Sequence, residues 1–403
     1  MDNIMNEQGE SKVSNEETKA GQNLYDDSNR GISMSLTKLD SGAPMQGIKP
    51  DGYSTLPPFL LDEIAKRTGD TAFATAAKDA SEMQSNGDTV RPRIETNMNG
   101  DREVYDAQTK TTLPGVKVRS EGEGPSGNTQ ADKAFDFTGF VRDFYKKEYG
   151  RDSIDGKGMK FVSTVNYGNN YENAFWNGRQ MTYGKPGPNS PFADFVLLDV
   201  AGHEITHGVT EKESGMTYYG QSGALNESMS DIFGEMIEQY SKNQTVDQAD
   251  WLIGNGIWKD NVKGKALRDM MNPGTAYDDP KVGKDPQPAH MKDYKKTWND
   301  NGGVHYNSGI PNRAFALFAT AVGGNAWDDA GHVFYNARKT AGNNPSFASF
   351  AFETLEAAKA MNKPGLVEKL QTAWETVGVT PVKGAKDTDT PIAPEAAAKK
   401  TAA

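Results

Sequence analysis

The chain of 403 residues contains no cysteine, which excludes disulfide bonds and metal sites built from thiolates. Basic residues are also in the minority. The 44 Lys and Arg are outnumbered by 55 Asp and Glu, and a net charge of -11 argues against a nucleic acid as partner. The sequence has no run of eighteen apolar residues, so it predicts no segment that spans a membrane.

The start of the chain lacks the features of a standard export signal. It has neither a basic stretch nor an apolar core, so it does not resemble a Sec signal peptide. Residues 1–50 are polar, acidic and nearly free of aromatic side chains, which predicts a disordered extension. Secretion by another route and a cytoplasmic location before release both remain open.

Histidine is rare as well, yet two of the five histidines stand in one short motif, HEITH at residues 203–207. Positions i and i+4 of a helix lie on the same face, so His203 and His207 can direct two imidazoles at one metal ion. Glu204 lies beside the first histidine and can reach a metal-bound water without binding the metal. The motif alone is short, and an amphipathic helix with two exposed polar residues would also produce it.

A second segment, 223–240, has an apolar repeat of 3.6 residues and therefore predicts a helix. Glu227 and Asp231 lie on its polar side. Facing the two histidines, Glu227 can be a third zinc ligand, and Asp231 can fix the tautomer of an imidazole. Two histidines and one carboxylate leave the fourth position of zinc open for water, as catalysis requires.

The order of predicted elements indicates two lobes. Strand-like runs at 160–165, 173–176 and 180–183 alternate with Gly/Asn turns and one helix near 132–149, and mostly helical segments follow. A helix over 191–210, with Ser190 as its cap, would carry HEITH. The predicted division is a disordered extension (1–50), a propeptide-like segment and joint (51–101), a β-rich lobe with the zinc helix (102–212), an α-helical lobe (213–382) and a disordered tail (383–403).

The chain from about residue 104 to 382 resembles the thermolysin family of neutral metalloendopeptidases. The segment with Pro57-Pro58 is similar to the short propeptide of the protealysin-like branch. The matching motifs, in family order, are VYDAQ (104–108), LPG (113–115), RDSID (151–155), NAFWNG (173–178), DVAGHEITHGVT (199–210), GALNESMSDIFG (223–234) and DNGGVHYNSGIPNRAF (300–315). The resemblance implies an α+β fold, with a β-rich N-terminal lobe, an α-helical C-terminal lobe and the HEITH helix at the floor of the cleft between them.

The resemblance also implies roles for individual residues. His203, His207 and Glu227 would bind one zinc ion, and Glu204 would be the general base. His305 and Tyr218 would stabilise the oxyanion. The remaining positions fall into three sets: Asp300, which would orient His305; Asp231 and Asn226, which would support the ligands; and Asn173, Ala174, Arg268, Phe192, Val200 and Leu267, which would contact substrate.

At the calcium site the sequence departs from the family pattern. Asp199 and Glu238 match carboxylates near a calcium ion, and Asp250 is a plausible third ligand. Members with two calcium ions carry further glutamates where this chain has Leu252 and Asn255. Because two adjacent divalent ions need several shared carboxylates, the sequence predicts one structural calcium.

Together these observations predict a monomeric zinc endopeptidase, made as a zymogen, that acts on proteins or peptides. The resemblance implies that it cleaves on the amino side of bulky apolar residues. Two alternatives are a non-catalytic zinc protein that binds peptides and a zinc hydrolase of non-peptide bonds. Pro57-Pro58 also has two interpretations. The pair can form a rigid plug, with Phe59 or Leu61 in the cleft, or it can begin a helix.

Overall fold

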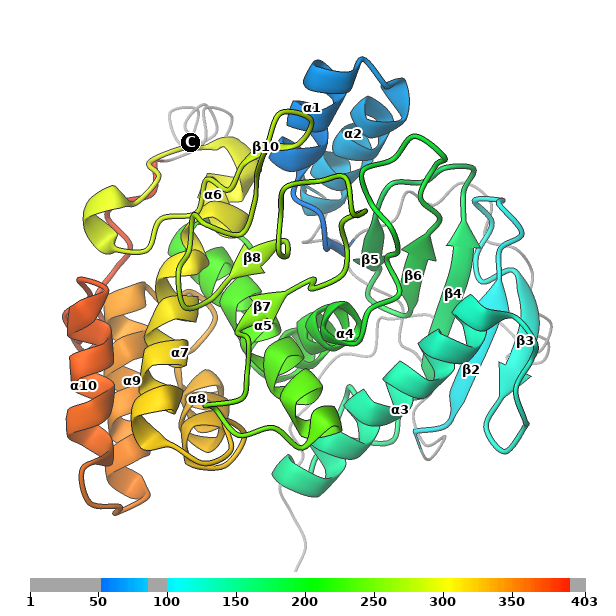
Figure 1. Cartoon of the computed structure of the whole chain (residues 1–403). Helices are drawn as coiled ribbons and strands as arrows, with labels where there is room; N and C mark the ends of the chain where they lie inside the picture. Colours follow the sequence, from blue (N-terminus) through cyan, green and yellow to red (C-terminus); the bar gives the residue numbers. More distant parts are fainter. Residues whose placement is uncertain (1–51, 86–99, 392–403) are drawn as a thin grey trace, which may run out of the picture. The chain divides into compact units, whose positions relative to one another are not determined.

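The structure is a computed structural model that describes residues 52–85 and 100–391 (Figure 1). The predictions for residues 1–50 and for most of the joint before residue 101 lie outside this range. Among the described residues no helix has the length and apolar character needed to cross a membrane.

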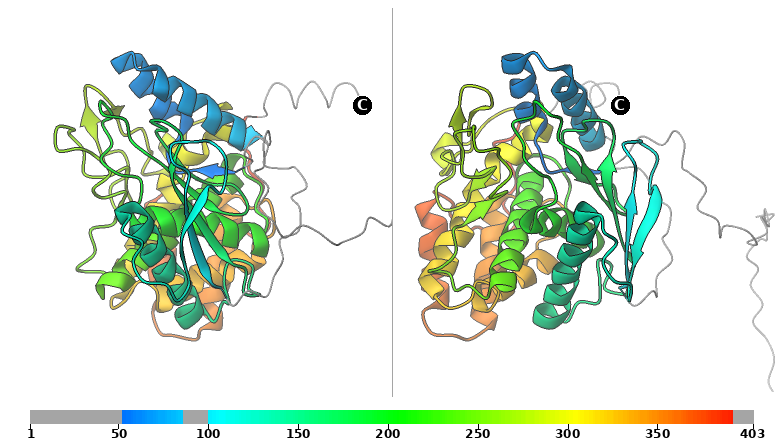
Figure 2. Two further views of the ribbon diagram at one scale, coloured as in Figure 1. Left: turned by 90° about the vertical axis from the view of Figure 1, so that its right-hand side faces the viewer. Right: turned by 45° about the vertical axis from the view of Figure 1, so that its right-hand side comes forward.

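The N-terminal lobe contains a mixed six-stranded sheet, seen at the right of Figure 1 and again in Figure 2. Its strands follow the order β1-β5-β6-β4-β2-β3, in which β2–β4 and β4–β6 pair in parallel. The bounds are β1 (Tyr53–Ser54), β2 (Arg102–Asp106), β3 (Val116–Ser120), β4 (Phe161–Tyr167), β5 (Ala174–Trp176) and β6 (Met181–Gly184). All three predicted strand runs are present. The sequence did not predict β1, which comes from the propeptide-like segment and extends the sheet at the β5 edge.

Helix α3 (Thr129–Tyr149) packs against the sheet and against the helix that bears HEITH. It starts where Asn128 accepts hydrogen bonds from the backbone N–H groups of Gln130 and Ala131, and it ends at Gly150, whose φ of 62° stops the helix. Its rings Phe144 and Tyr145 are buried in the core that joins the two lobes.

Two long helices cross the centre of the molecule, α4 (Leu198–Glu213) and α5 (Gly220–Lys242). They approach closely because Gly202 and Gly234 face each other. A Cβ atom on Gly202 would lie 3.0 Å from the Cα of Gly234. The helix predicted to begin at residue 191 begins instead at Leu198, because Phe192 forms a β-bridge with Trp258 and holds the preceding chain extended. Ser190 is therefore not a cap.

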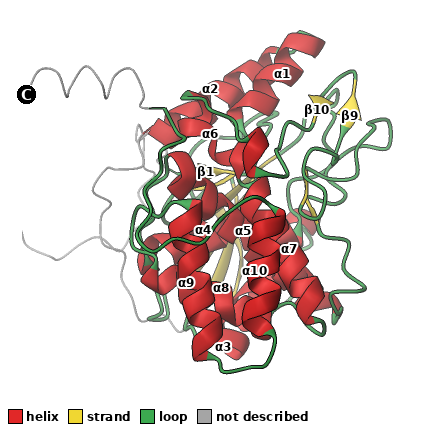
Figure 3. Ribbon diagram, turned by 90° about the vertical axis from the view of Figure 1, so that its left-hand side faces the viewer, coloured by secondary structure: helices red, strands yellow, loops and turns green. Residues whose placement is uncertain are grey.

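The C-terminal lobe is helical, as predicted, and Figure 3 shows its helices side by side. Its core contains the stacked or edge-on rings of Phe315, Phe334, Phe350 and Trp374. Short elements connect α5 to the later helices. The bounds are β7 (Leu252–Ile253), β8 (Arg268–Asp269), β9 (Asp278–Asp279), β10 (Gly283–Lys284), η1 (Met291–Asp293), α6 (Asn299–Asn307), α7 (Gly309–Val322), α8 (Asp329–Thr340), α9 (Phe347–Ala360) and α10 (Leu366–Thr376).

The propeptide-like segment forms α1 (Pro58–Thr68) and α2 (Thr71–Ser85), drawn in blue in Figure 1. Pro57 is the N-cap and Pro58 the first helical residue, where a missing N–H costs no hydrogen bond. The interpretation of the proline pair as a helix start is therefore confirmed. Leu60 and Leu61 are buried in the same apolar core as Phe192.

The prediction of a disordered tail over 383–403 is wrong for its first part. Residues 383–391 are described and bonded to the folded lobe, whereas 392–403 lie outside the described range. A polar composition weakens burial, but it does not prevent ordering where side chains find specific backbone partners.

Candidate active site

Three side chains from the two central helices meet at one buried point. His203 and His207 come from successive turns of α4, and their Nε2 atoms are 3.0 Å apart. From α5, Glu227 places Oε1 3.2 Å from Nε2 of His207 and Oε2 3.5 Å from Nε2 of His203. All three side chains are almost completely buried. The spacing in the sequence thus brings the predicted zinc ligands together.

The hydrogen bonds of the two imidazoles favour metal binding. Nδ1 of His203 lies 2.8 Å from Asp231 Oδ1, and Nδ1 of His207 lies 2.8 Å from Asn226 Oδ1. With a proton on each Nδ1, both Nε2 lone pairs point toward Glu227. Burial lowers the pKa of His203 to about 4, which keeps its ring neutral. Burial opposes a charged ring at His207, but Glu227 outweighs it and raises the pKa of His207. A positive charge is therefore favoured between the three groups, where a cation such as zinc fits.

Asp231 is itself held in place by neighbouring side chains. The Arg268 guanidinium donates to both carboxylate oxygens, at 2.8 and 2.6 Å, and Asn312 adds a third hydrogen bond of 2.7 Å. The sequence predicted that Arg268 contacts substrate. The contact with substrate stays a prediction, and the structure shows in addition that Arg268 is buried and anchors the carboxylate that orients His203.

Glu204 lies beside these ligands but is not one of them. Its Oε2 accepts a hydrogen bond of 3.0 Å from the backbone N–H of Trp176 in β5. Its Oε1 accepts one of 2.5 Å from the hydroxyl of Thr55, which follows β1. Burial raises the pKa of Glu204 to about 7. Both carboxylate oxygens are thus occupied by hydrogen bonds from the sheet edge and from the segment that follows β1.

His305 approaches the same point from the other side of the cleft. Oδ1 of Asp300 lies 2.7 Å from Nδ1 of His305, and Oδ2 of Asp300 accepts a hydrogen bond of 2.9 Å from the backbone N–H of His305. Burial opposes a charged ring, but Glu227 and Asp300 outweigh it and raise the pKa of His305 to about 9. Tyr218 places its hydroxyl 3.4 Å from Nε2 of His305 and also donates to Glu227. A cationic imidazole and a phenol thus lie next to the ligand cluster.

A left-handed turn inside α6 makes this arrangement possible. Residues Asp300, Asn301, Gly302 and Gly303 have φ values of 53°, 48°, 80° and 82°, so the right-handed helix begins only after them. Glycine, asparagine and aspartate tolerate this region best. The turn folds Asp300 back onto His305, and the Asn301 amide donates to the carbonyl of Tyr218 at 3.1 Å.

The predicted peptide-binding edge is occupied by the chain itself. Strand β1 pairs antiparallel with β5, matching Tyr53 with Trp176 and Ser54 with Phe175. The pairing continues beyond β1, where the N–H of Thr55 donates to the carbonyl of Ala174 at 3.0 Å. Extended segments bind sheet edges in this way.

The side chains of this segment contact the centre of the site. The Asn173 side chain accepts a hydrogen bond of 3.0 Å from the Leu56 N–H. Leu56 belongs to the same buried core as Phe192, Val200 and Leu267, the residues predicted to form the substrate pocket. The ring of Tyr53 stacks on His207 with centroids 4.2 Å apart, and the Ser54 carbonyl lies 3.3 Å from Nε2 of His305. Segment 53–56 therefore lies at the centre of the site. Of the two residues predicted to fill the cleft, Phe59 stacks on Tyr306, and Leu61 is buried in the core that contains Phe192.

A second cluster of carboxylates lies at the far end of α5. Glu235, Glu238 and Asp250 bring ligand oxygens within 4.8 Å of one another. The sequence analysis missed Glu235, although its position three residues before Glu238 places both on one helix face. Asp199 lies outside this group of oxygens, and its carboxylate accepts hydrogen bonds from the N–H groups of Val200 and Gly254. Burial and the charge of Glu238 raise the pKa of Asp199.

The combination of two lobes, a central cleft and a zinc-type ligand set beside a buried glutamate defines a metallopeptidase. Residues 70–211 match the family described as thermolysin metallopeptidase, catalytic domain, and residues 214–379 match its alpha-helical domain. The chain therefore belongs to the thermolysin family, as its motifs predicted. It is a zinc-dependent protease that acts on proteins or peptides.

Individual relatives agree with this assignment. The chain is 45% identical to an extracellular metalloprotease of Pectobacterium carotovorum subsp. carotovorum, over 81% of this chain and 96% of that protein. It is 39% identical to Protease PrtS of Photorhabdus sp. (strain Az29), over 84% and 96% of the two chains. The solved structure of the precursor of protealysin, a metalloproteinase from Serratia proteamaculans, matches with a TM-score of 0.74 and 44% identity, over 81% of this chain and 99% of that one.

Proposed function

We propose that this protein is an endopeptidase that cleaves on the amino side of bulky apolar residues and is made as a self-processing zymogen. One observation carries the proposal: an extended segment of the chain lies in the cleft as a peptide substrate would. Its Ser54 carbonyl is 3.3 Å from Nε2 of His305, and the next residue, Thr55, donates to Glu204. A peptide bond thus passes between the candidate base and the candidate oxyanion donor.

The roles follow from these positions. Zinc, when bound by His203, His207 and Glu227, lowers the pKa of water and polarises a carbonyl. Glu204 takes the proton from the attacking water and later passes it to the leaving amine. His305 and Tyr218 donate hydrogen bonds to the oxyanion as negative charge develops.

Two residues keep this machinery in place. Asp300 holds His305 protonated and oriented through two hydrogen bonds. Asp231 fixes the tautomer of His203 and is in turn anchored by Arg268. In this proposal Arg268 acts on the zinc ligand through Asp231, in addition to its predicted contact with substrate.

The preference for bulky apolar residues is supported by the core to which Leu56 belongs. The candidate pocket residues Phe192, Val200 and Leu267 lie in the same large cluster of buried apolar side chains, and none of the four is more than 3% exposed. A large apolar side chain of a substrate would replace Leu56 there and gain about 1.5–3 kcal/mol from burial.

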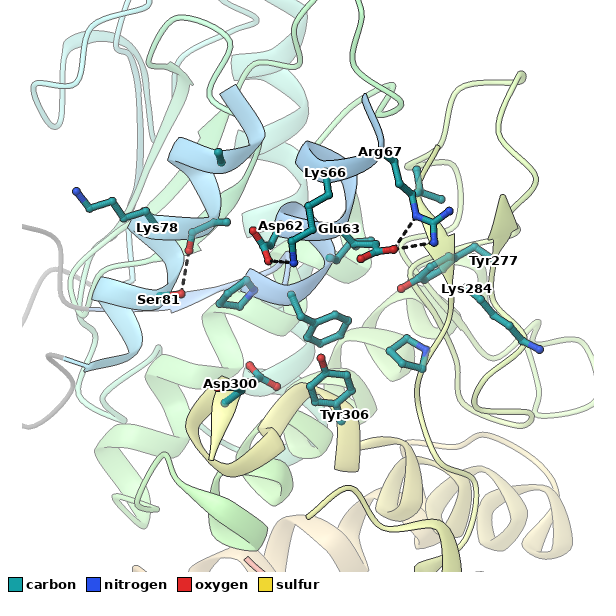
Figure 4. Close-up of a pocket in the computed structure, with 18 residues that line it drawn as sticks. Asp62, Glu63, Lys66, Arg67, Lys78, Ser81, Tyr277, Lys284, Asp300 and Tyr306 are labelled. Carbon is teal, nitrogen blue, oxygen red and sulfur yellow. Dashed lines mark hydrogen bonds and ion pairs between the residues drawn. The ribbon is translucent and has the colours of Figure 1, made fainter. Parts of the chain in front are cut away.

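The zymogen proposal rests on segment 53–56, which blocks the substrate edge, the ligand His207 and the base Glu204 together. Helices α1 and α2 support this segment and contact the folded lobe, since Leu60 and Leu61 are buried and the ring of Phe59 stacks on that of Tyr306. A cavity of about 860 Å³ is lined by parts of both helices and by the loops around Tyr277 and Tyr306 (Figure 4). The ion pairs of α1, Lys66 with Asp62 and Arg67 with Glu63, lie within the helix and do not cross the cavity. Cleavage in the joint, between about residues 91 and 105, would release the whole segment.

Two further properties belong to the same proposal. Glu235, Glu238 and Asp250 would bind one calcium ion, since burial raises the pKa of Glu235 and its Oε2 atom accepts no hydrogen bond within the described ranges 52–85 and 100–391. The protein would act outside the cell, as the names of its relatives suggest.

The test is to incubate the purified full chain with casein, with and without a zinc chelator. We expect casein hydrolysis that the chelator abolishes, together with loss of the N-terminal segment and a new N-terminus between about residues 91 and 105. The Glu204→Ala variant is the matched control and should neither cleave casein nor shorten. Full activity of a chain that still carries Pro57 would contradict the zymogen proposal, while activity resistant to the chelator would contradict the mechanism.

A further inference from the structure

The polar segment after the last helix returns to the catalytic centre. The matched helical domain ends at residue 379, and the chain then passes along the start of α9. There the Val382 N–H donates to the carbonyl of Ala348 at 3.0 Å, and the Ser346 hydroxyl donates to the carbonyl of Ala385 at 3.0 Å. In Figure 1 this red segment runs from α10 toward α6. It brings Asp387 to the first turn of α5.

Asp387 caps the helix that carries Glu227. The first N–H groups of any helix lack partners within the helix, and a carboxylate there also complements the helix dipole. Helix α5 has no acidic residue in its first turn, and its N-cap residue Tyr219 gives no capping hydrogen bond. Oδ2 of Asp387 fills this role, accepting from the N–H of Gln221 at 3.0 Å. Its Oδ1 accepts from the N–H groups of Asp389 and Thr390, which fixes the carboxylate in a turn.

Thr390 lies where the two catalytic segments touch. Gly220 and Gly302 both have positive φ, and a Cβ on Gly302 would lie 2.9 Å from the backbone nitrogen of Gly220. The Thr390 side chain packs against this contact. A Cβ on Gly302 would lie 2.6 Å from Cγ2 of Thr390. The hydroxyl of Thr390 lies 2.6 Å from that of Tyr294, and the hydroxyl of Tyr219 donates to the carbonyl of Pro391 at 2.8 Å.

The two glycines at this contact are close in sequence to the proposed oxyanion donors. Gly220 comes two residues after Tyr218, and Gly302 lies between Asp300 and His305. The tail therefore holds together the two backbone segments that carry the proposed oxyanion donors. A shift of about 1 Å between such groups can cost a large factor in rate.

We propose that two side chains of this tail, Asp387 and Thr390, are positioning residues of the catalytic site that fix Tyr218 and His305 relative to Glu227. This inference rests on the proposed roles of Tyr218 and His305. A merely structural tail would contribute to stability and leave the turnover of the folded enzyme unchanged.

The test compares three variants of the full chain. Each is assayed after self-processing is complete, when its activity no longer increases with time. Asp387→Ala removes the cap, Asp387→Asn keeps only one of the two acceptor oxygens, and Lys386→Ala removes an exposed neighbour. We expect Asp387→Ala to lower kcat about five- to tenfold, because Tyr218 and His305 would shift relative to the ligands, with KM and zinc content nearly unchanged. Asp387→Asn should give an intermediate kcat, and Lys386→Ala should match the unmodified chain.

A second measurement does not depend on activity. In the full chain, Asp387→Ala should speed hydrogen exchange of backbone amides in 219–224 and 299–305, which Lys386→Ala should not do. If Asp387→Ala fails to fold, Thr390→Ala decides, with an expected two- to threefold loss of kcat. An Asp387→Ala enzyme of lower Tm but unchanged kcat overturns the inference. The variant His305→Ala separates the two proposals: if it leaves kcat intact, the oxyanion assignment itself fails.

Discussion

Replacing Thr55 with valine should loosen the block on the active site without changing the shape of the blocking segment. Valine has nearly the volume of threonine and suits an extended backbone equally well. What it removes is the hydroxyl that donates to Glu204 at 2.5 Å, in a position that is only 1% exposed. The carboxylate loses a hydrogen bond that water cannot replace while the segment stays in the cleft.

The magnitude follows from the type of hydrogen bond. Above pH 7, where Glu204 is ionised, a bond to the charged group contributes about 1.5–3 kcal/mol, and about 1.4 kcal/mol corresponds to a factor of ten. The ratio of open to blocked chains should therefore rise about 10- to 150-fold in Thr55→Val. Thr55→Ser is the matched control, because it keeps the hydroxyl and loses only a methyl group.

The assay follows freshly purified full chains with a small quenched peptide and records the N-terminal processing of the same samples. We expect Thr55→Val to show a higher initial rate and a much shorter lag than the unmodified chain, with Thr55→Ser close to the unmodified chain. An initial rate and lag identical to those of the unmodified chain would refute the reasoning, because the Thr55–Glu204 contact would then contribute nothing to inhibition.

Four further substitutions test the other proposed roles. Glu204→Ala should retain a stoichiometric amount of zinc and lose at least ~10²-fold in activity, whereas Glu227→Ala should lose zinc itself; metal analysis that finds no zinc in Glu204→Ala would contradict this. His305→Ala should lower kcat with little effect on KM, since its contact strengthens as charge develops, and a pure KM effect in steady-state kinetics would make it a ground-state binding residue. Added calcium should raise the Tm of the unmodified chain more than that of Glu235→Gln, and thermal unfolding with no calcium effect on either would argue against the site.

Some features could be predicted because they depend on local periodicity. The strand runs, the C-terminal helices and the pairing of HEITH with the segment around Glu227 all follow from spacings of two or 3.6 residues. The start of α4 could not be predicted, because the bridge between Phe192 and Trp258 involves chain segments far apart in the sequence. Glu235 was overlooked, although its spacing from Glu238 could have revealed it.

By itself the sequence determined the chemistry at the zinc site. The i, i+4 histidines, the adjacent glutamate and the second acidic helix specify which groups share a face before any fold is known. The tertiary structure decided which residues from distant parts of the chain contact this site. Thr55 lies 149 residues before Glu204, and the two-residue strand β1 that leads to it has no pattern to detect. The tail that caps α5 is likewise polar and irregular. Asp387 can accept a hydrogen bond from the Gln221 N–H only when the folded lobe brings the first turn of α5 next to the tail.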